Sequence, residues 1–415
     1  MMKEKEEKRV PQLRFPEFTD DWEQRKVGDF TNVLSASRVH KNEWKEDGVP
    51  FFRSSDVVSA FKGNSNEKAF ISAELYEELI KLSGKLEKDD ILITGGGSIG
   101  IPYVVPNNEA LYSKDADLIW IKNSLKHDSK YLFTYFTSEC FRDYINSISH
   151  VGTIAHYTIE QVKNTPIWFP NILEQKAIGI YFSHLDHLIT LHQRKLEKLK
   201  KLKKGLVQKL FSQEVRFKAD DGSEFPEWEE KKLGELGTFI KGAALSKADI
   251  SEYGSPFILY GELYTTYKEV AYNIQRRTQA IVDKKYYSCI GDVVIPTSGE
   301  SAEEISTATC VMVPNVILGG DLNIFRSDIV DGRIMSYILN HQVKWKIAMI
   351  AQGKSIVHIQ AKQLSNIYVK YPVSKVEQQK IADCLSLLDD VIEKQKVTLA
   401  AWEEMKKGLL QQMFV

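Results

Sequence analysis

Residues 172–211 read I-L-E-Q-K-A-I-G-I-Y-F-S-H-L-D-H-L-I-T-L-H-Q-R-K-L-E-K-L-K-K-L-K-K-G-L-V-Q-K-L-F. This stretch has no proline, and its apolar residues recur every seventh residue at two seam positions. Eight of the ten seam residues are apolar, and the ten are Ile178, Phe182, Leu185, Ile189, His192, Leu196, Leu199, Lys203, Leu206 and Leu210. Sustained heptads predict a helix that pairs in a coiled coil. A helix of this length rises about 60 Å.

The same pattern returns near residue 415, so the sequence predicts two long helices. The second seam is also apolar at eight of ten positions, and it consists of Ile381, Leu385, Leu388, Ile392, Gln395, Leu399, Trp402, Lys406, Leu409 and Met413. Residues 172–211 carry nine basic and three acidic residues, a net charge of +6, whereas residues 376–415 carry five Lys and seven acidic residues, a net charge of −2. Opposite charges favour pairing of one helix with the other. The basic run from Arg194 to Lys209 fits a solvated helix face and a DNA-contacting face equally well.

Polar seam residues suggest a register for this pairing. His192 and Gln395 occupy equivalent mid-helix positions. If the helices run antiparallel, these two residues meet and a buried polar pair fixes the register. In that register Lys203 faces the neighbourhood of Asp383, and Lys406 faces Tyr181.

The helices belong to a duplication that covers nearly the whole chain. Six collinear blocks recur at offsets between 202 and 206 residues; among them Trp22–Gly28 recurs as Trp228–Gly234, Asp89–Ile93 as Gly291–Ile295, Glu174–Ile178 as Glu377–Ile381, and Lys203–Phe211 as Lys406–Phe414. Such self-similarity is typical of tandem structural repeats. Leu13-Arg14-Phe15 also matches Val215-Arg216-Phe217. We therefore expect Leu13–Phe15 to dock near Phe414, as Val215–Phe217 docks near Phe211.

The segments between these blocks show almost no identity, which holds for residues 28–90 against residues 234–292. One scaffold therefore carries two different surfaces. A duplicated enzyme would repeat its catalytic residues, whereas a protein that reads two different targets would vary them.

A glycine-rich loop illustrates this variation. Residues 90–100 read D-I-L-I-T-G-G-G-S-I-G and fit G-x-G-x-x-G, but Pro102 and Pro106 in the following β-forming segment predict a second strand instead of the helix that a dinucleotide site needs. The corresponding residues Pro296–Ser301 lose the glycine spacing. The loop is therefore a variable turn between strands.

Composition excludes several classes of protein. The apolar content is 43%, the charged content is 27%, and no apolar run is long enough to span a bilayer. The charged first residues lack the apolar core of a secretion signal. The four cysteines have no C-x-x-C spacing, which predicts reduced thiols, no metal site and a cytoplasmic location. The net charge of −1 neither supports nor excludes a nucleic-acid partner.

Taken together, the duplicated Trp-Glu start, the D-I-L-I strand with its turn, and the Pro followed by Glu-Gln before a long helix resemble the specificity subunit of type I restriction-modification systems. The resemblance covers the chain from about Leu13 onward. It implies an α+β fold in which a mixed α/β target-recognition domain and a long helix occur twice, with the helices paired as an antiparallel coiled coil of pseudo-two-fold symmetry. The expected segments are a charged tail (1–12), a first recognition domain (13–171), a spacer helix (172–212), a second recognition domain (213–374) and a second spacer helix (375–415).

The resemblance also implies a function and partners. Such a subunit, present in a single copy, reads a bipartite asymmetric site in double-stranded DNA, without a membrane and without catalysing a reaction. Two modification subunits bind S-adenosylmethionine and methylate adenine, and two restriction subunits use ATP and Mg to translocate and cleave DNA. The chain itself is expected to bind no cofactor.

Residue type and position give candidate DNA contacts, because Lys, Arg, Ser and Thr bind phosphates and loop side chains read bases. In the first half the candidates are Ser35, Arg38, Arg53, Ser54, Thr94, Gly96, Ser98, Thr153, His156 and Tyr157. In the second half they are Lys241, Ser246, Lys247, Tyr260, Tyr264, Thr266, Thr297, Ser298, Lys354 and His358. The alternative function is a protein-interaction scaffold that carries two adapter domains on a coiled-coil spacer and binds no DNA.

Overall fold

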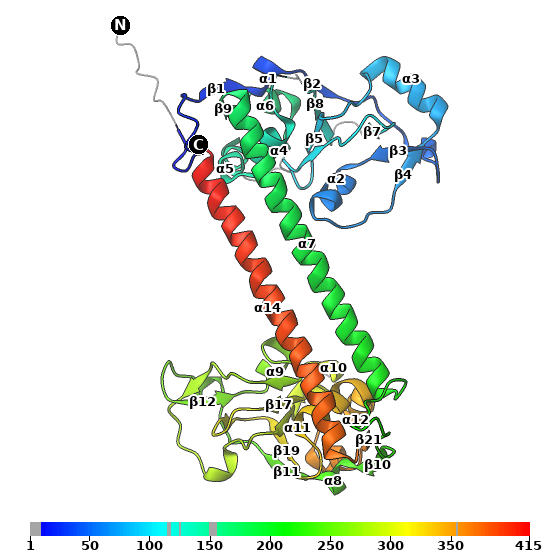
Figure 1. The fold of residues 1–415 in the computed structure, drawn as a ribbon, viewed down its shortest axis with the longest axis vertical. Helices are drawn as coiled ribbons and strands as arrows, with labels where there is room; N and C mark the ends of the chain where they lie inside the picture. The colour runs from blue at the N-terminus through cyan, green and yellow to red at the C-terminus, as the bar shows by residue number, and fades with distance from the viewer. Residues whose placement is uncertain (1–9, 114–117, 124–125, 149–155, 354–355) are drawn as a thin grey trace. The chain divides into compact units, whose positions relative to one another are not determined.

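The computed structural model describes residues 10–113, 118–123, 126–148, 156–353 and 356–415. Its contacts divide the chain into two units, Met1–Lys195 with Lys396–Val415, and Leu196–Gln395. Each unit combines one mixed α/β domain with part of helix α7 (Ile172–Phe211) and part of helix α14 (Lys375–Met413) (Figure 1). The predicted fold class, a duplicated α/β domain followed each time by a long helix, is confirmed. No helix among the described residues is both long enough and apolar enough to cross a membrane.

Three sheets build the first unit. A four-stranded antiparallel sheet has the order β2-β8-β5-β6, a three-stranded sheet has the order β4-β3-β7, and strands β1 and β9 form an antiparallel pair. The strand bounds are β1 Glu23–Lys26, β2 Val33–Ser35, β3 Val49–Phe52, β4 Ala69–Ile71, β5 Ile91–Thr94, β6 Pro102–Val104, β7 Tyr112–Ser113, β8 Leu118–Ile121 and β9 Pro166–Phe169. The helix bounds are α1 Val27–Phe30, α2 Ser54–Phe61, α3 Ala73–Ser83, α4 Ser129–Thr137, α5 Glu139–Ile148 and α6 Ile159–Lys163.

The second unit repeats this topology. Its main sheet has the order β11-β19-β15-β17, extended by β13; a three-stranded sheet has the order β14-β12-β18; and β10 pairs with β21. The strand bounds are β10 Glu229–Lys232, β11 Thr238–Lys241, β12 Ser255–Ile258, β13 Val270–Ala271, β14 Arg277–Thr278, β15 Asp292–Pro296, β17 Thr309–Val311, β18 Ile317–Leu318, β19 Leu322–Arg326 and β21 Tyr368–Tyr371. The helix bounds are α8 Leu233–Leu236, α9 Glu262–Thr265, α10 Ala302–Ile305, α11 Gly332–Tyr337, η4 Ile338–Gln342, α12 Lys344–Ile350 and α13 Ala361–Ser365. The same strand order in both units supports the duplication.

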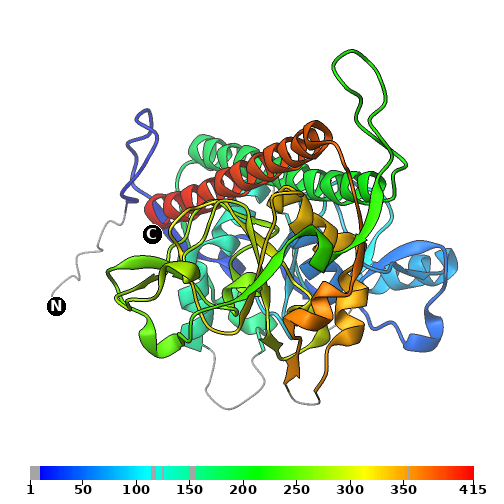
Figure 2. The ribbon, with the colours of Figure 1, turned by 90° about the horizontal axis from the view of Figure 1, so that it is seen from below.

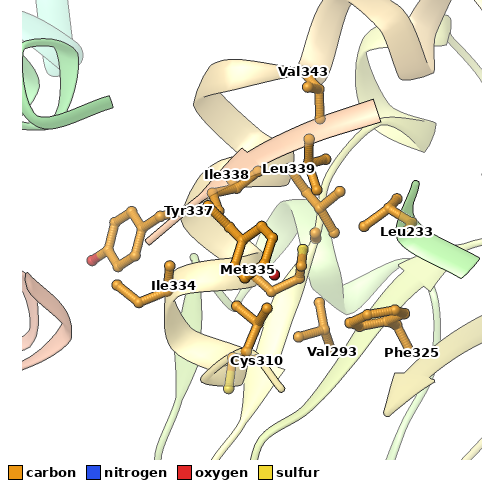
Figure 3. Packing of buried hydrophobic residues seen from close by; sticks show 14 of the residues in the cluster. Leu233, Val293, Cys310, Phe325, Ile334, Met335, Tyr337, Ile338, Leu339 and Val343 are labelled. Carbon is orange, nitrogen blue, oxygen red and sulfur yellow. The ribbon is translucent and has the colours of Figure 1, made fainter. Parts of the chain in front are cut away.

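Each unit has its own apolar core, to which the long helices contribute. In the second unit, Met335 of α11 and Leu339 of η4 pack with Val293 and Phe325 of the sheet (Figure 3). The end of α7, through Phe211, belongs to the same core. In the first unit the corresponding contribution comes from the end of α14, where Leu410, Met413 and Phe414 join residues of the domain and of the first half of α7. The helices are therefore part of both cores.

The beginning of each long helix is fixed by a buried Glu-Gln pair. Glu174 and Glu377 are fully buried and accept hydrogen bonds from the guanidinium groups of Arg14 (2.7 Å) and Arg216 (3.1 Å). These bonds raise the pKa of both arginines. The amide of Gln175 donates to Pro170 O (2.8 Å) and accepts from Asp128 N (3.1 Å).

The amide of Gln378 makes the same two bonds, donating to Pro372 O (2.7 Å) and accepting from Asp331 N (2.7 Å). The repeated Pro and Glu-Gln motif therefore joins three things: the last strand of each domain, the segment that precedes the domain, and the helix. This role explains why these residues recur while the surrounding surfaces vary.

The expected docking of the two matching segments is confirmed. Leu13 N donates to Gln412 O at 2.9 Å, and Val215 N donates to Lys209 O at 3.2 Å, which is the equivalent contact one repeat earlier. The segment that carries Val215 and Arg216 continues as a green loop beyond the end of α7 (Figure 2).

Aromatic rings complete these junctions. The ring of Phe414 lies 6.5 Å from that of Trp22, and the ring of Phe211 lies 6.0 Å from that of Trp228. Each domain therefore receives the same aromatic contact from the end of a long helix. The repeat is circular in the sense that the last helix of the chain contacts the first domain as the first helix contacts the second.

The predicted partners of the two seam lysines are wrong, because each lysine pairs with a carboxylate five or six residues further along the facing helix. In the first unit Lys406 Nζ pairs with Asp186 (2.5 Å) and not with Tyr181, and the ring of His192 lies 6.2 Å from that of Trp402, seven residues beyond Gln395.

The second unit shows the same shift, because Lys203 Nζ pairs with Asp389 at 2.8 Å, whereas Asp383 pairs with Arg333. Two partly buried lysines find carboxylates in the observed register. Such charge-assisted bonds are stronger than bonds between neutral groups.

The buried carboxylate of the second unit gives a stability test. In the variant Arg216→Ala, Glu377 stays buried without its partner, and loss of one member of a buried ion pair costs about 3–5 kcal/mol. We expect a lower denaturant midpoint by circular dichroism. The control is Lys218→Ala, which breaks the exposed Lys218–Glu224 pair (2.8 Å) and should leave the midpoint unchanged. Equal midpoints for the two variants would contradict the proposed role of Arg216.

Candidate nucleic-acid interface

The same backbone bond holds a variable loop in both units. In the first unit Gly95 O, just after β5, accepts from Tyr157 N at 2.8 Å. In the second unit Thr297 O, just after β15, accepts from Ile359 N at 3.0 Å. Donor and acceptor are both displaced by 202 residues between the repeats. The bond places an exposed histidine, His156 in one unit and His358 in the other, beside the loop.

The first loop is a compact turn between strands, as the sequence predicted. Thr94 O accepts from Gly100 N at 2.7 Å, and the Thr94 hydroxyl donates to Ser98 O. Gly97 and Gly100 have φ angles of 68° and 73°, which favour glycine. A Cβ on Gly100 would lie 3.0 Å from the Phe141 ring. The loop therefore leads into strand β6 and presents Ser98 at its exposed tip.

Three candidates of this loop are covered by protein. Thr94, Gly96 and Tyr157 are buried, and burial holds the pKa of the Tyr157 hydroxyl well above its usual range while it bonds to Thr165. In this structure the side chains of Thr94 and Tyr157 position the loop, and none of the three residues forms its surface. Ser98 and His156 present exposed polar side chains at this place.

The other candidates of the first unit lie on or near β2, β3 and α2. Arg38 is exposed, whereas Ser35 and Ser54 are half-buried. Arg53 is held internally, because its Nε donates to Asp56 at 2.8 Å and its guanidinium carbon lies 5.5 Å from the centre of the Trp44 ring. The bond to Asp56 raises the pKa of Arg53. Thr153 lies outside the described residues.

In the second unit four chain segments meet at the loop. Thr297 N donates to Asp321 O at 2.7 Å, and the neighbouring Gly320 N donates to Leu245 O at 3.1 Å. These bonds draw together the loop after β15, the turn before β19 and the loop after β11. Strand β11 ends at the exposed candidate Lys241, and the loop after it carries the exposed candidates Ser246 and Lys247. Ser246 also caps a short helical turn at residues 247–249.

The fourth segment carries His358. Strands β16 (Ser298–Gly299) and β20 (Val357–His358) pair antiparallel, with Ser298 opposite His358. Their side chains meet, since Ser298 Oγ lies 3.1 Å from His358 Nδ1. The histidine backbone exchanges two hydrogen bonds with Gln352, of 2.8 and 3.1 Å. This arrangement fixes the position of an exposed imidazole beside the loop. Lys354 lies outside the described residues.

Two tyrosines lie near this loop. The rings of Tyr260 and Tyr264 are 6.3 Å apart and meet edge to face. Burial, together with Tyr260 and the carboxylates of Glu304 and Glu300, raises the pKa of Tyr264 to about 12. Tyr264 therefore keeps its proton near neutral pH and remains a hydrogen-bond donor. Thr266, the remaining candidate of this group, is exposed.

Sequence reasoning missed two acidic residues at this surface, Glu300 and Asp321. Asp321 adopts a φ of 57° at the turn before β19, and Glu300 is exposed immediately after β16. The available signal for Glu300 was its place five residues after the repeated Gly291–Ile295 block. Among the described residues, no group of three or more His, Cys, Asp or Glu side chains forms a possible metal site.

The fourteen residues predicted to pair the helices are all buried or half-buried. The buried ones are Ile178, Phe182, Leu185, Ile189, Leu196, Ile381, Leu385, Ile392 and Gln395. The half-buried ones are His192, Leu199, Leu388, Leu399 and Trp402.

Comparison with known proteins gives a consistent result. Residues 19–201 and 226–400 match the family described as type I restriction modification DNA specificity domain. The chain is 24% identical, over 98% of its length and 95% of the relative, to the type I restriction enzyme MjaVIII specificity subunit of Methanocaldococcus jannaschii. It is 25% identical, over 95% of its length and 93% of the relative, to the putative MjaX specificity subunit of the same organism.

A solved structure has the same fold. The S subunit of a type I restriction-modification system from M. genitalium superposes with a TM-score of 0.61 at 18% identity, covering 98% of this chain and 99% of that one. The duplicated domain, the repeated Glu-Gln helix start and the match of both repeats lead to one assignment: the chain belongs to the family of type I restriction-modification specificity subunits, with one DNA specificity domain in each repeat.

Proposed function

We propose that the chain reads a bipartite, asymmetric DNA site, with one half-site for each repeat. The observation that carries this proposal is the conserved bond from the loop to the histidine segment, Gly95–Tyr157 in one unit and Thr297–Ile359 in the other. The backbone frame is the same, but the side chains that it presents differ. Direct readout depends on the donors and acceptors that side chains offer to base edges. Two different sets on one frame should therefore select two different half-sites.

The two surfaces offer different chemistry for this reading. The first presents Ser98 and His156 beside a glycine-rich turn. The second presents Tyr264, Ser298 and His358, with Lys241 at the end of β11 and Lys247 on the adjoining loop. Lysines suit phosphate contacts, which position the protein, whereas hydroxyl and imidazole groups suit base edges. The scaffold alternative does not account for this convergence of polar side chains on one repeated loop.

Partners and cofactors follow from membership of the family and form part of this proposal. The chain acts as a non-catalytic component, in a single copy, with two modification subunits that bind S-adenosylmethionine and two restriction subunits that use ATP and Mg. A solved structure with a TM-score of 0.53 comes from work on complex assembly of the type I R-M system. A cytoplasmic location accompanies this role, because the DNA to be read is there.

The salt dependence of DNA binding tests the proposal. We expect the chain, together with its modification subunit, to bind mixed-sequence duplex DNA with an affinity that falls linearly with salt concentration on logarithmic axes, because phosphate contacts release counterions. The measurement is fluorescence anisotropy over a salt series. Salt-independent binding, or none, would favour the protein-scaffold alternative.

Each histidine should affect one half-site only. We expect His156→Ala to weaken adenine methylation at sites defined by the first half-site and His358→Ala at sites defined by the second, each by roughly 5- to 150-fold if a base contact is lost. Both side chains are exposed, so the fold should be unaffected. The readout is methylation of site variants in each half-site. If either substitution changed both half-sites equally, the separation of roles would be wrong.

Exchange of one domain should change one half-site. The segment 22–170 begins and ends at the pair β1–β9, where Glu23 lies opposite Phe169, so a replacement from another family member brings its own closing strands. We expect methylation mapping to show a new first half-site beside the original second one. A change at both ends would contradict the proposal.

The long helices should set the gap between half-sites. The two units divide after Lys195 and after Gln395. Seven residues inserted at both junctions add about 10 Å of helix without altering contacts inside either unit. We expect one of two results. Either the number of base pairs between the half-sites changes, or methylation is lost because the two domains no longer face both half-sites on the same side of the DNA helix. Altered bases within a half-site would show that the helices do more than space the domains.

A further inference from the structure

Glu300 stands out at the second surface because its carboxylate is uncommitted. It follows β16 directly and is exposed, one residue from Gly299 and two from Ser298, whose hydroxyl meets His358. Within the described residues the Glu300 carboxylate accepts no hydrogen bond and joins no ion pair. Its backbone N–H is held by the Glu304 carboxylate at 3.1 Å. The backbone of Glu300 is thus fixed while its side chain is free to act.

The neighbouring carboxylates are engaged within the protein. Glu304 holds the Glu300 backbone, and Glu303 lies 3.7 Å from Lys344 Nζ. Asp321 accepts from the Thr297 hydroxyl at 3.4 Å and, through its backbone carbonyl, from Thr297 N at 2.7 Å. Among the described carboxylates at this loop, Glu300 is therefore the one that remains for a ligand.

A carboxylate at a DNA-binding surface is repelled by the phosphates, so its presence needs a compensating contact. Carboxylates are acceptor-only when ionised. In the major groove the amino group of cytosine, N4–H₂, is the donor that Glu and Asp bind, whereas adenine is better matched by Asn or Gln. A carboxylate cannot bind a phosphate, which is also an acceptor. The base edge is thus the one part of the duplex that suits this side chain.

We propose that Glu300 specifies a C·G pair in the second half-site by accepting a hydrogen bond from the cytosine amino group. This inference rests on the proposed function. It does not extend to the first half-site, because the residue that corresponds to Glu300 is Ser98, and the loop from Thr94 to Ile101 contains no carboxylate. A hydroxyl both donates and accepts hydrogen bonds, so Ser98 does not restrict the base pair to one that offers a donor.

The variant Glu300→Gln tests the proposal on the whole chain with its modification subunit. Glutamine keeps the size of the side chain but adds donors, and it pairs with adenine N6 and N7. We expect the methylated motif of the variant to change at one C·G pair of the second half-site. The preference for that pair over A·T should fall by about 5- to 150-fold or reverse, the range that one base contact provides. The first half-site should stay the same.

The matched control is Glu303→Gln, which removes the charge of a neighbouring exposed carboxylate that faces Lys344. It should leave the motif unchanged, and thermal unfolding of both variants should match the parent chain. An E300Q motif identical to that of the parent chain, or a change confined to the first half-site, would overturn the inference and leave the proposed function standing. Absence of any sequence-specific methylation with the parent chain would overturn both.

Discussion

A buried carboxylate at the start of each long helix is the interaction on which the rest of the structure depends. Glu174 and Glu377 are fully buried, and each is neutralised by an arginine that precedes its domain. The adjoining glutamines bond to the last strand and to the first turn of a domain helix. Removing a charge from water is costly unless its partners are in place. In each repeat, these contacts therefore hold the domain, the segment that precedes it and the long helix in the same relative arrangement.

That fixed frame allows the loops to vary. The same sheet order occurs in both units, and the same backbone bond holds each loop against the segment that carries the exposed histidine. Between them the side chains differ, from a turn of glycines and Ser98 in one unit to Ser298 and Glu300 in the other. A protein built in this way changes what it reads through loop substitutions, while the residues that hold the frame stay the same. This division between constant frame residues and variable loop residues explains why the two repeats match only in separate blocks of sequence.

The sequence was sufficient for the architecture because heptads, the duplicated blocks and the turn residues act locally. It predicted both long helices, the strand after the glycine loop and the docking of Leu13 and Val215. The partners of Lys406 and Lys203 could not be read from seam polarity, because Asp186 and Asp389 lie beside the seam and meet these lysines only in three dimensions.

Surface residues were harder to predict for the same reason. Thr94 and Tyr157 look polar and accessible in the sequence, but they are buried because they close the loop from within. The role of Glu300 depends on which neighbouring carboxylates are already engaged, and no pattern in a single sequence reports that.

Site-specific photocrosslinking tests the central claim most directly. A photoreactive residue placed at position 98, and separately at position 300, in the chain bound to its modification subunit and to its DNA site, reports which bases each loop approaches. We expect position 98 to crosslink only to one half-site and position 300 only to the other. Crosslinks from both positions to the same half-site would contradict the assignment of one half-site to each repeat.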